Sequence, residues 1–163
     1  MDKTDLLILK LLEENAKIDT QDLAIMTEIP TVEAESRIKV MEKEGIIRRY
    51  SAVINWEQTG YTPVLAVLDL KVSPERDFGY DRIADRIARF SEVKALRLVT
   101  GAYDLEVLVS GKSMQEIARF VAEHIAPMDR IRETATHIVM KVYKENGDIF
   151  FEREVGERLP FSF

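Results

Sequence analysis

The chain contains no cysteine, which excludes disulfide bonds, thiolate metal sites and cysteine nucleophiles. Its only two histidines, His124 and His137, form no His-x-x-x-His metal motif. It also lacks a Gly-x-Ser-x-Gly motif, a P-loop, a dinucleotide fingerprint and any apolar run long enough to span a membrane. The N-terminus, MDKTD, is charged and does not resemble a signal peptide. We expect a cytoplasmic protein without membrane contact, metal site, cofactor or catalytic residues.

Positive charge is scarce, because the chain has 23 Lys and Arg residues and 29 Asp and Glu residues, which gives a net charge of −6. Residues 1–60 hold eight basic and twelve acidic side chains. This balance opposes DNA binding, in which neutralisation of phosphates dominates the affinity. A local basic cluster within residues 37–49 favours DNA binding, although Glu42 and Glu44 interrupt it. The cluster predicts either phosphate contacts or a solvated helix face with internal ion pairs.

Apolar spacing within residues 2–15, 19–29 and 30–45 predicts three helices joined by short polar turns. Their inward side chains are expected to be Leu6, Leu9, Leu12, Leu23, Met26, Ala34, Ile38 and Met41. A run rich in β-branched residues over 46–54 predicts a strand. Three helices and a strand within residues 1–56 are typical of a winged helix-turn-helix, a DNA-binding domain.

The third predicted helix would lie in the major groove of double-stranded DNA. Arg37 is the best candidate for a guanine or phosphate contact, and an ion pair with Glu33 is its alternative role. DNA contact favours neutral or basic side chains, whereas Glu33 and Glu35 near the start of this helix are acidic. These two carboxylates therefore oppose DNA binding by this helix. The predicted DNA-binding residues are Glu33, Ser36, Arg37, Lys39, Lys43, Arg48 and Arg49.

Residues 62–144 follow the order strand, helix, strand, strand, helix, strand, after a linker at about 51–62. This order predicts a ferredoxin-like βαββαβ domain, so the whole chain belongs to the α+β class. Helices can cover only one face of such a sheet, and the other face would carry Leu65, Val67 and Leu96 or their neighbours. An uncovered apolar face predicts self-association. In the tail, residues 145–163, we expect a turn at 146–148 and docking of the apolar end, 159–163, on a partner subunit.

With both domains placed, the chain resembles the Lrp/AsnC family of transcriptional regulators over residues 2–143. Four segments carry the resemblance, DKTDLLILKLLEENAKID, SRIKVMEKEGIIRRYSAVIN, VTGAYDLEVLV and RETATHIVMKV. The chain departs from the family pattern at Pro30, Glu33 and Glu35, where a Ser cap and small or basic side chains are usual. The resemblance implies a DNA-binding regulator that forms a homodimer through its C-terminal sheets, with further assembly to an octamer.

The resemblance also implies a small effector, usually an amino acid, bound at a Gly-x-Tyr-Asp turn. Residues Gly101, Ala102, Tyr103 and Asp104 match this turn, and Thr134 and Thr136 match threonines that complete the site. The chemistry is suitable, because backbone N–H groups at a glycine can hold a carboxylate and Asp104 can pair with an ammonium group. The alternative is an ordinary hairpin turn with two strand-forming threonines.

Two other functions remain open from the sequence. The acidic N-terminal domain is compatible with a metabolic ligand-binding module that has little DNA affinity. Some proteins of related architecture are sirohaem decarboxylases, which would require histidine and arginine side chains gathered in a pocket. The scattered positions of His124 and His137 disfavour this enzyme.

Overall fold

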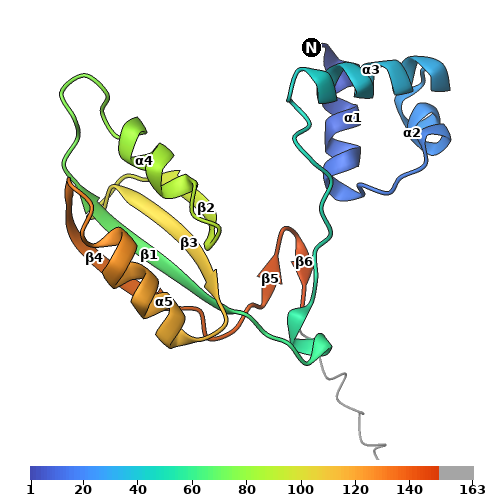
Figure 1. Ribbon diagram of the computed structural model, residues 1–163. Coiled ribbons are helices and arrows are strands. Elements are labelled where there is room, and N and C mark those ends of the chain that lie inside the picture. Colours follow the sequence, from blue (N-terminus) through green and yellow to red (C-terminus); the bar gives the residue numbers. More distant parts are fainter. Residues whose placement is uncertain (151–163) are drawn as a thin grey trace, which may run out of the picture. The chain divides into compact units, whose positions relative to one another are not determined.

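The computed structural model describes residues 1–150 and divides into two compact units, with the boundary between Ile54 and Asn55. The first unit consists of three helices (Figure 1): α1 (Lys3–Glu14), α2 (Thr20–Thr27) and α3 (Thr31–Lys43). The side chain of Asp2 caps α1 and forms a reciprocal capping box with Asp5. Asp19 caps α2, and its carboxylate accepts a hydrogen bond from the backbone N–H of Gln21.

The core of the first unit contains Ile8, Leu23, Ala24, Ala34 and Met41. Two residues expected to face inward do not, since Leu6 is 51% exposed and Met26 is 55% exposed. On α1 the fully buried side chain is instead that of Ile8. On the short helix α2, the buried positions Leu23, Ala24 and Thr27 leave Met26 on the outer side.

The predicted strand at 46–54 does not form. After α3 the chain is irregular up to a 3-10 turn, Trp56–Thr59. A strand exists only when another segment accepts its backbone hydrogen bonds, and no segment within residues 1–150 pairs with this one. The β-branched composition of residues 46–54 was therefore insufficient to form a strand.

The second unit is an antiparallel sheet with two helices (Figure 1). Its elements are β1 (Val64–Val72), α4 (Asp81–Ala88), β2 (Val93–Leu98), β3 (Leu105–Gly111), α5 (Met114–Phe120) and β4 (Ile131–Ile138). A short π-helical segment, Val121–Ile125, continues α5. The strand order β2-β3-β1-β4 is that of the ferredoxin-like fold, as the sequence predicted.

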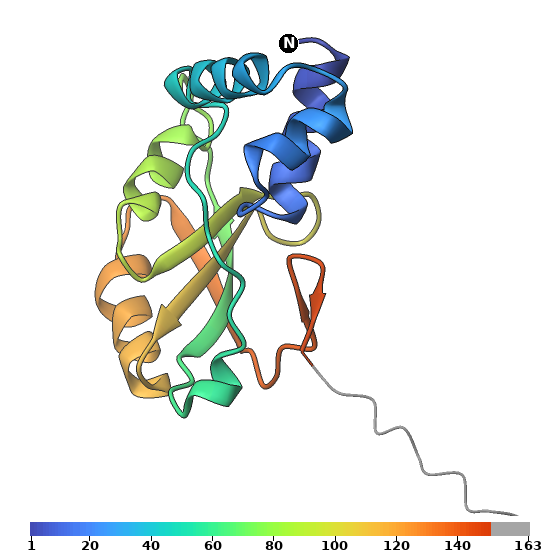
Figure 2. The ribbon, with the colours of Figure 1, turned by 90° about the vertical axis from the view of Figure 1, so that its right-hand side faces the viewer.

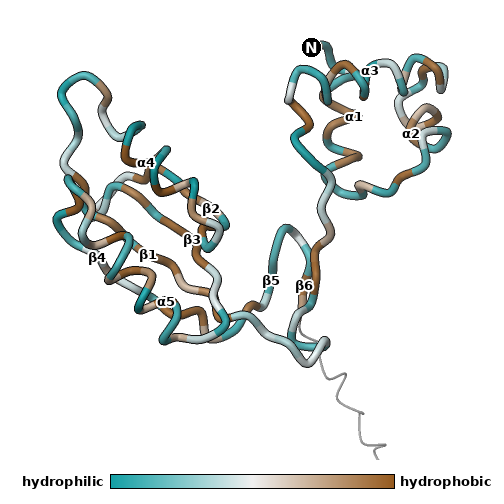
Figure 3. The backbone as a smooth tube through the Cα atoms, viewed as in Figure 1, coloured by the Kyte–Doolittle hydropathy of each residue, from teal (hydrophilic) through white to brown (hydrophobic). Residues whose placement is uncertain are grey.

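Both helices lie on one face of the sheet, as Figure 2 shows from the side. Alternate residues of β1, from Ala66 to Val72, are buried beneath them together with Ile87 of α4 and Ile117 of α5. Figure 3 shows the hydrophobic character of β1 and β3 that this packing hides. Leu96 belongs to this covered side as a half-buried core residue, so its assignment to the open face was wrong.

After the sheet, β5 (Lys144–Glu145) and β6 (Asp148–Ile149) form a short hairpin. Its turn residues Asn146 and Gly147 have φ values of 46° and 96°, and Asn-Gly is the preferred pair for such a turn. The apolar end, 159–163, lies outside the described residues. Within residues 1–150, no helix has the length and hydrophobicity needed to cross a membrane.

Candidate functional site

Arg37 joins α3 to the beginning of α1 instead of projecting freely. Its Nη1 atom lies 2.7 Å from Asp2 Oδ2 and 2.8 Å from Asp5 Oδ1. Its Nε and Nη2 atoms donate to the same oxygen of Glu33, at 2.9 and 2.8 Å. The predicted alternative, an Arg37–Glu33 pair, is therefore present, and two carboxylates from α1 extend it.

This cluster shifts the ionisation of its members. The hydrogen bond from Arg37 lowers the pKa of Asp2, and the backbone N–H of Asp2 together with Arg37 lowers the pKa of Asp5. The same hydrogen bonds raise the pKa of Arg37 above its ordinary value. The carboxyl groups of Asp2 and Asp5 are consequently ionised near neutral pH, and together they more than balance the charge of Arg37.

The outer face of α3 carries a separate stripe formed by Ser36, Lys39, Val40 and Lys43. The positions i, i+3, i+4 and i+7 lie along one side of a helix, and all four side chains are exposed. Within residues 1–150, neither lysine of the stripe forms an ion pair. We call this set the α3 stripe.

Two further basic side chains, Arg48 and Arg49, follow α3 and are exposed. The adjacent Tyr50 donates its hydroxyl to Glu42 Oε1 at 2.8 Å, which connects the segment after the helix back to α3. Burial and the Glu42 contact raise the pKa of Tyr50. Neither arginine forms an ion pair with another residue in the described part of the chain.

In the second unit, the turn between β2 and β3 is held by Asp104. Its Oδ2 atom accepts the backbone N–H of Val72 at 2.8 Å, and its Oδ1 atom accepts the hydroxyl of Tyr80 at 3.2 Å. Lys71 Nζ lies 3.5 Å from Oδ2. The N–H of Val72 is the main reason why the pKa of Asp104 is low, with Lys71 and Tyr80 contributing. Asp104 therefore joins the end of β1, the start of β3 and the residue that precedes α4.

The rest of the turn is more open. Gly101 has a φ of 132°, a conformation that favours glycine, and both Gly101 and Ala102 are exposed. Within residues 1–150, their backbone N–H groups donate to no hydrogen-bond acceptor. The Tyr103 hydroxyl donates to Glu133 Oε1 at 3.2 Å, which raises the pKa of Tyr103.

The two threonines of β4 lie on the other side of the sheet. Thr134 is opposite Leu70 and Thr136 is opposite Leu68, both of which are buried under the helices. Residues opposite each other on antiparallel strands project to the same face. Glu133 is opposite Lys71 and contacts the turn. Within one chain, the two threonines and Glu133 therefore project from opposite faces of the sheet.

Three residues at this turn were not among the predicted site residues: Val72, Tyr80 and Glu133. No local pattern could have identified them, because their contacts are with residues 24 to 32 positions away. The two histidines are also in separate places. His124 packs on the rings of Phe90 and Phe120, and His137 Nε2 lies 3.3 Å from Asp69 Oδ2.

Comparison with known proteins identifies both units. Residues 1–48 match the winged helix-turn-helix DNA-binding family, and residues 65–149 match the Lrp/AsnC ligand binding domain. The second match covers more than half of the chain. The chain belongs to the Lrp/AsnC family. It is a transcriptional regulator with a DNA-binding unit and a ligand-binding unit, as the sequence predicted.

Relatives of this regulator extend along nearly its whole length. The HTH-type transcriptional regulator YugG of Bacillus subtilis is 40% identical over 95% of this chain and 94% of its own. PH0140 of Pyrococcus horikoshii, another HTH-type transcriptional regulator, is 32% identical over 88% of this chain and 89% of its own. These family members are regulators of transcription.

Solved structures share the fold. E. coli AsnC superposes with a TM-score of 0.66 at 23% identity, covering 89% of this chain and 95% of its own. The regulator NMB0573 of Neisseria meningitidis, solved as a complex with L-Met, gives a TM-score of 0.68 at 23% identity. That match covers 89% of this chain and 93% of the Neisseria protein.

Proposed function

We propose that this Lrp/AsnC regulator contacts double-stranded DNA through the α3 stripe together with Arg48 and Arg49. The observation that carries the proposal is the division of cations on α3. Arg37 is neutralised by Asp2, Asp5 and Glu33, whereas the two lysines of the stripe have no internal partner within residues 1–150.

Each part of this surface suits a different DNA contact. The hydroxyl of Ser36 suits a base edge or a phosphate, and the methyl groups of Val40 suit the methyl group of thymine. Lys39, Lys43 and the arginine pair suit phosphates. Arg37 then acts as a positioning residue that orients α3, and Glu33 acts through it.

Fluorescence anisotropy with the DNA upstream of the protein's own gene, over a series of salt concentrations, tests this assignment. Lys39→Ala and Lys43→Ala should each reduce the salt slope by about 1, because each lost phosphate contact releases about one counterion fewer. Arg48→Ala combined with Arg49→Ala should reduce it by about 2. Lys10→Ala on α1, outside the proposed surface, is the matched control. Absence of binding by the wild-type protein at low salt would favour the metabolic ligand-binding module.

We propose that the effector is an amino acid bound at the 101–104 turn. The Neisseria protein, which shares the fold, was solved as a complex with L-Met, and this supports an amino acid as the effector. The free backbone N–H groups of Gly101 and Ala102 suit its carboxylate. The ammonium group would pair with Glu133, which is exposed and hydrogen-bonded only by Tyr103 within residues 1–150. Asp104 already serves three donors of its own chain, so its role is to hold the turn in shape. Thr134 and Thr136 would contribute from a neighbouring chain.

A thermal-shift screen against the twenty common amino acids tests the effector, because a ligand of the folded state raises its melting temperature. Glu133→Gln should abolish the shift without unfolding the protein. Glu123→Gln on the exposed side of the segment after α5 makes the same change elsewhere and should retain the shift. A shift that survives in Glu133→Gln would place the ligand at another site.

The open face of the sheet supports a further part of the proposal, a homodimer that can assemble to an octamer. Leu65, Val67 and Leu108 lie on this face and are half-buried in one chain. Two DNA-binding units on one particle act at high effective concentration and compensate for an acidic domain. We also propose that the protein has no catalytic activity and acts on DNA in the cytoplasm.

A further inference from the structure

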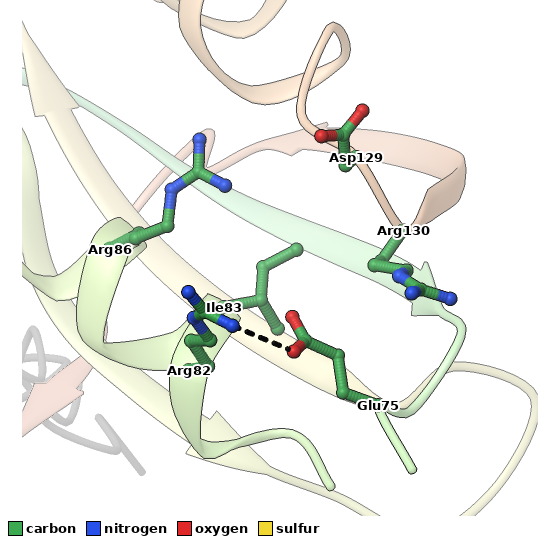
Figure 4. A pocket seen from close by; sticks show the side chains of 6 residues that line it. All are labelled: Glu75, Arg82, Ile83, Arg86, Asp129 and Arg130. Carbon is green, nitrogen blue, oxygen red and sulfur yellow. Dashed lines mark hydrogen bonds and ion pairs between the residues drawn. The ribbon is translucent and has the colours of Figure 1, made fainter. Parts of the chain in front are cut away.

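A hollow of about 460 Å³ on the second unit has no role in the function proposed above. Its lining comprises Glu75, Arg82, Ile83, Arg86, Asp129 and Arg130 (Figure 4). Three segments supply these residues: the loop after β1, the helix α4 and the turn before β4. The volume lies within the range of small-molecule sites.

The frame of this hollow is fixed by backbone hydrogen bonds. The N–H of Ser73 donates to the carbonyl of Arg130 at 2.8 Å, which connects the loop to the turn. Glu75 and Gly79 exchange two hydrogen bonds of 2.9 Å and close the loop on itself. Arg132 also donates a hydrogen bond to the hydroxyl of Ser73. These hydrogen bonds fix the backbone positions of the loop and the turn that carry the side chains at the rim.

Three arginines line this hollow, and Figure 4 shows Arg82 and Arg86 on one side of Ile83 and Arg130 on the other. Arg82 has one partner, Glu75, at 3.4 Å. Within residues 1–150, the side chains of Arg86, Arg130 and Asp129 have no hydrogen bond or ion pair. Three positive and two negative charges leave an excess of one positive charge in a protein whose net charge is −6.

The backbone of Arg130 is a second, independent observation. Its φ is 83°, in the left-handed region that favours glycine and that a long side chain rarely adopts. A strained conformation persists only where the surrounding structure enforces it, and such residues cluster at ligand sites. Arg130 is one of the residues that line the hollow, on the side opposite Arg82 and Arg86 (Figure 4).

We propose that this hollow binds the oxyanion group of a small metabolite, either a carboxylate or a phosphate, through Arg86 and Arg130. A guanidinium group presents two parallel N–H donors that match both kinds of oxyanion. Arg82 supplies a third donor from the rim. The site is separate from the 101–104 turn and from the α3 stripe, so it goes beyond the proposed function.

The test uses the full chain and three probes: succinate, inorganic phosphate and pyrophosphate. Chloride at matched ionic strength is the reference, and the melting temperature and calorimetric titration are the readouts. We expect at least one probe at about 10 mM to stabilise the protein beyond chloride. Succinate alone would indicate a carboxylate ligand, whereas phosphate or pyrophosphate alone would indicate a phosphorylated ligand.

Variants separate binding from folding. Arg86→Gln should weaken the probe at least tenfold, whereas Arg89→Gln should not, because Arg89 lies on the exposed side of the same region and pairs with Asp85 at 2.8 Å. Arg130→Gly should also lose binding, but with unchanged or increased stability, because glycine adopts this backbone conformation without strain. Stabilisation no greater than with chloride, or equal losses in Arg86→Gln and Arg89→Gln, would overturn the proposal. Neither result depends on DNA binding or on the amino-acid effector.

Discussion

At the residue scale, Asp104 shows that a side chain in the turn proposed to bind the effector can have a structural task. Its carboxylate accepts a backbone hydrogen bond from Val72 and a hydroxyl hydrogen bond from Tyr80. These contacts join three elements that are distant in the sequence. Removing the carboxylate therefore changes the shape of the turn as well as its charge.

We predict that Asp104→Ala lowers the free energy of unfolding by about 1–3 kcal/mol, because the N–H of Val72 loses its acceptor in a half-buried position. Urea denaturation measures the change. Asp85→Ala is the control, since its ion pair with Arg89 is exposed and such pairs contribute about 0–1 kcal/mol. Equal losses in the two variants would show that Asp104 has no special structural role.

The low pKa of Asp104 also predicts a dependence of stability on acid. Because the folded-state pKa lies below the unfolded value of 3.8, the contribution is fully present above that pH. It is lost as the pH falls from about 4 towards the folded-state pKa. Asp2 and Asp5 have lowered pKa values and act in the same direction. Stability measured from pH 7 downwards should therefore fall less steeply in Asp104→Asn than in the wild type.

At the element scale, the ion pairs around Arg37 connect α3 to the beginning of α1. Two carboxylates of the α1 capping box and one of α3 converge on a single guanidinium group. The cluster leaves the other side of α3, with Ser36, Lys39 and Lys43, free of ion pairs within residues 1–150. The arrangement separates the residue that orients the helix from those proposed to contact DNA.

We predict that Arg37→Gln lowers the melting temperature and the DNA affinity together, because three carboxylates lose their common partner. Lys39→Ala should lower the affinity alone. The loss of stability in Arg37→Gln should shrink at high salt, which screens exposed charges. Arg37→Lys should rescue only in part, since an ammonium group cannot reproduce the forked contacts. A variant Arg37→Gln with wild-type stability and weakened DNA binding would instead make Arg37 a direct DNA contact.

At the scale of the whole molecule, assembly depends on the sheet of the second unit, which has one face covered by α4 and α5 and one face that no helix of this unit covers (Figure 1). On the open face, Leu108 lies opposite Val67 of β1 and Ala95 of β2. These apolar side chains cover the middle of the face, while Asp69 and Glu106 lie farther along the same strands. The apolar part is the expected contact between subunits.

We predict that Leu108→Lys shifts the protein from an oligomer to the 18.7 kDa monomer, because a lysine at this position would be buried without a partner in the interface. Light scattering coupled to gel filtration measures the mass. Ala122→Lys introduces the same charge on the exposed side of the helical segment after α5 and should leave the oligomer intact. A wild-type protein that is already monomeric at micromolar concentration would contradict the interface.

The sequence by itself determined the features that depend on near neighbours. The helices predicted from about residues 2 and 19 begin there as α1 and α2, because the caps Asp2 and Asp19 act on N–H groups two or three residues away. The alternation along β1 identified its buried face. These local signals were sufficient for the three N-terminal helices and for the order of elements in residues 62–144, and hence for the ferredoxin-like fold of the second unit.

Only the tertiary structure decided which partners the functional side chains have. Arg37 is 32 and 35 positions away from the carboxylates that neutralise it, and Asp104 is 32 positions after the N–H that it accepts. The oxyanion hollow combines three separate segments, and residues 46–54 lack a pairing strand within the described residues. Periodicity and composition describe one segment at a time, whereas charge neutralisation and strand pairing depend on a second segment that folding brings near.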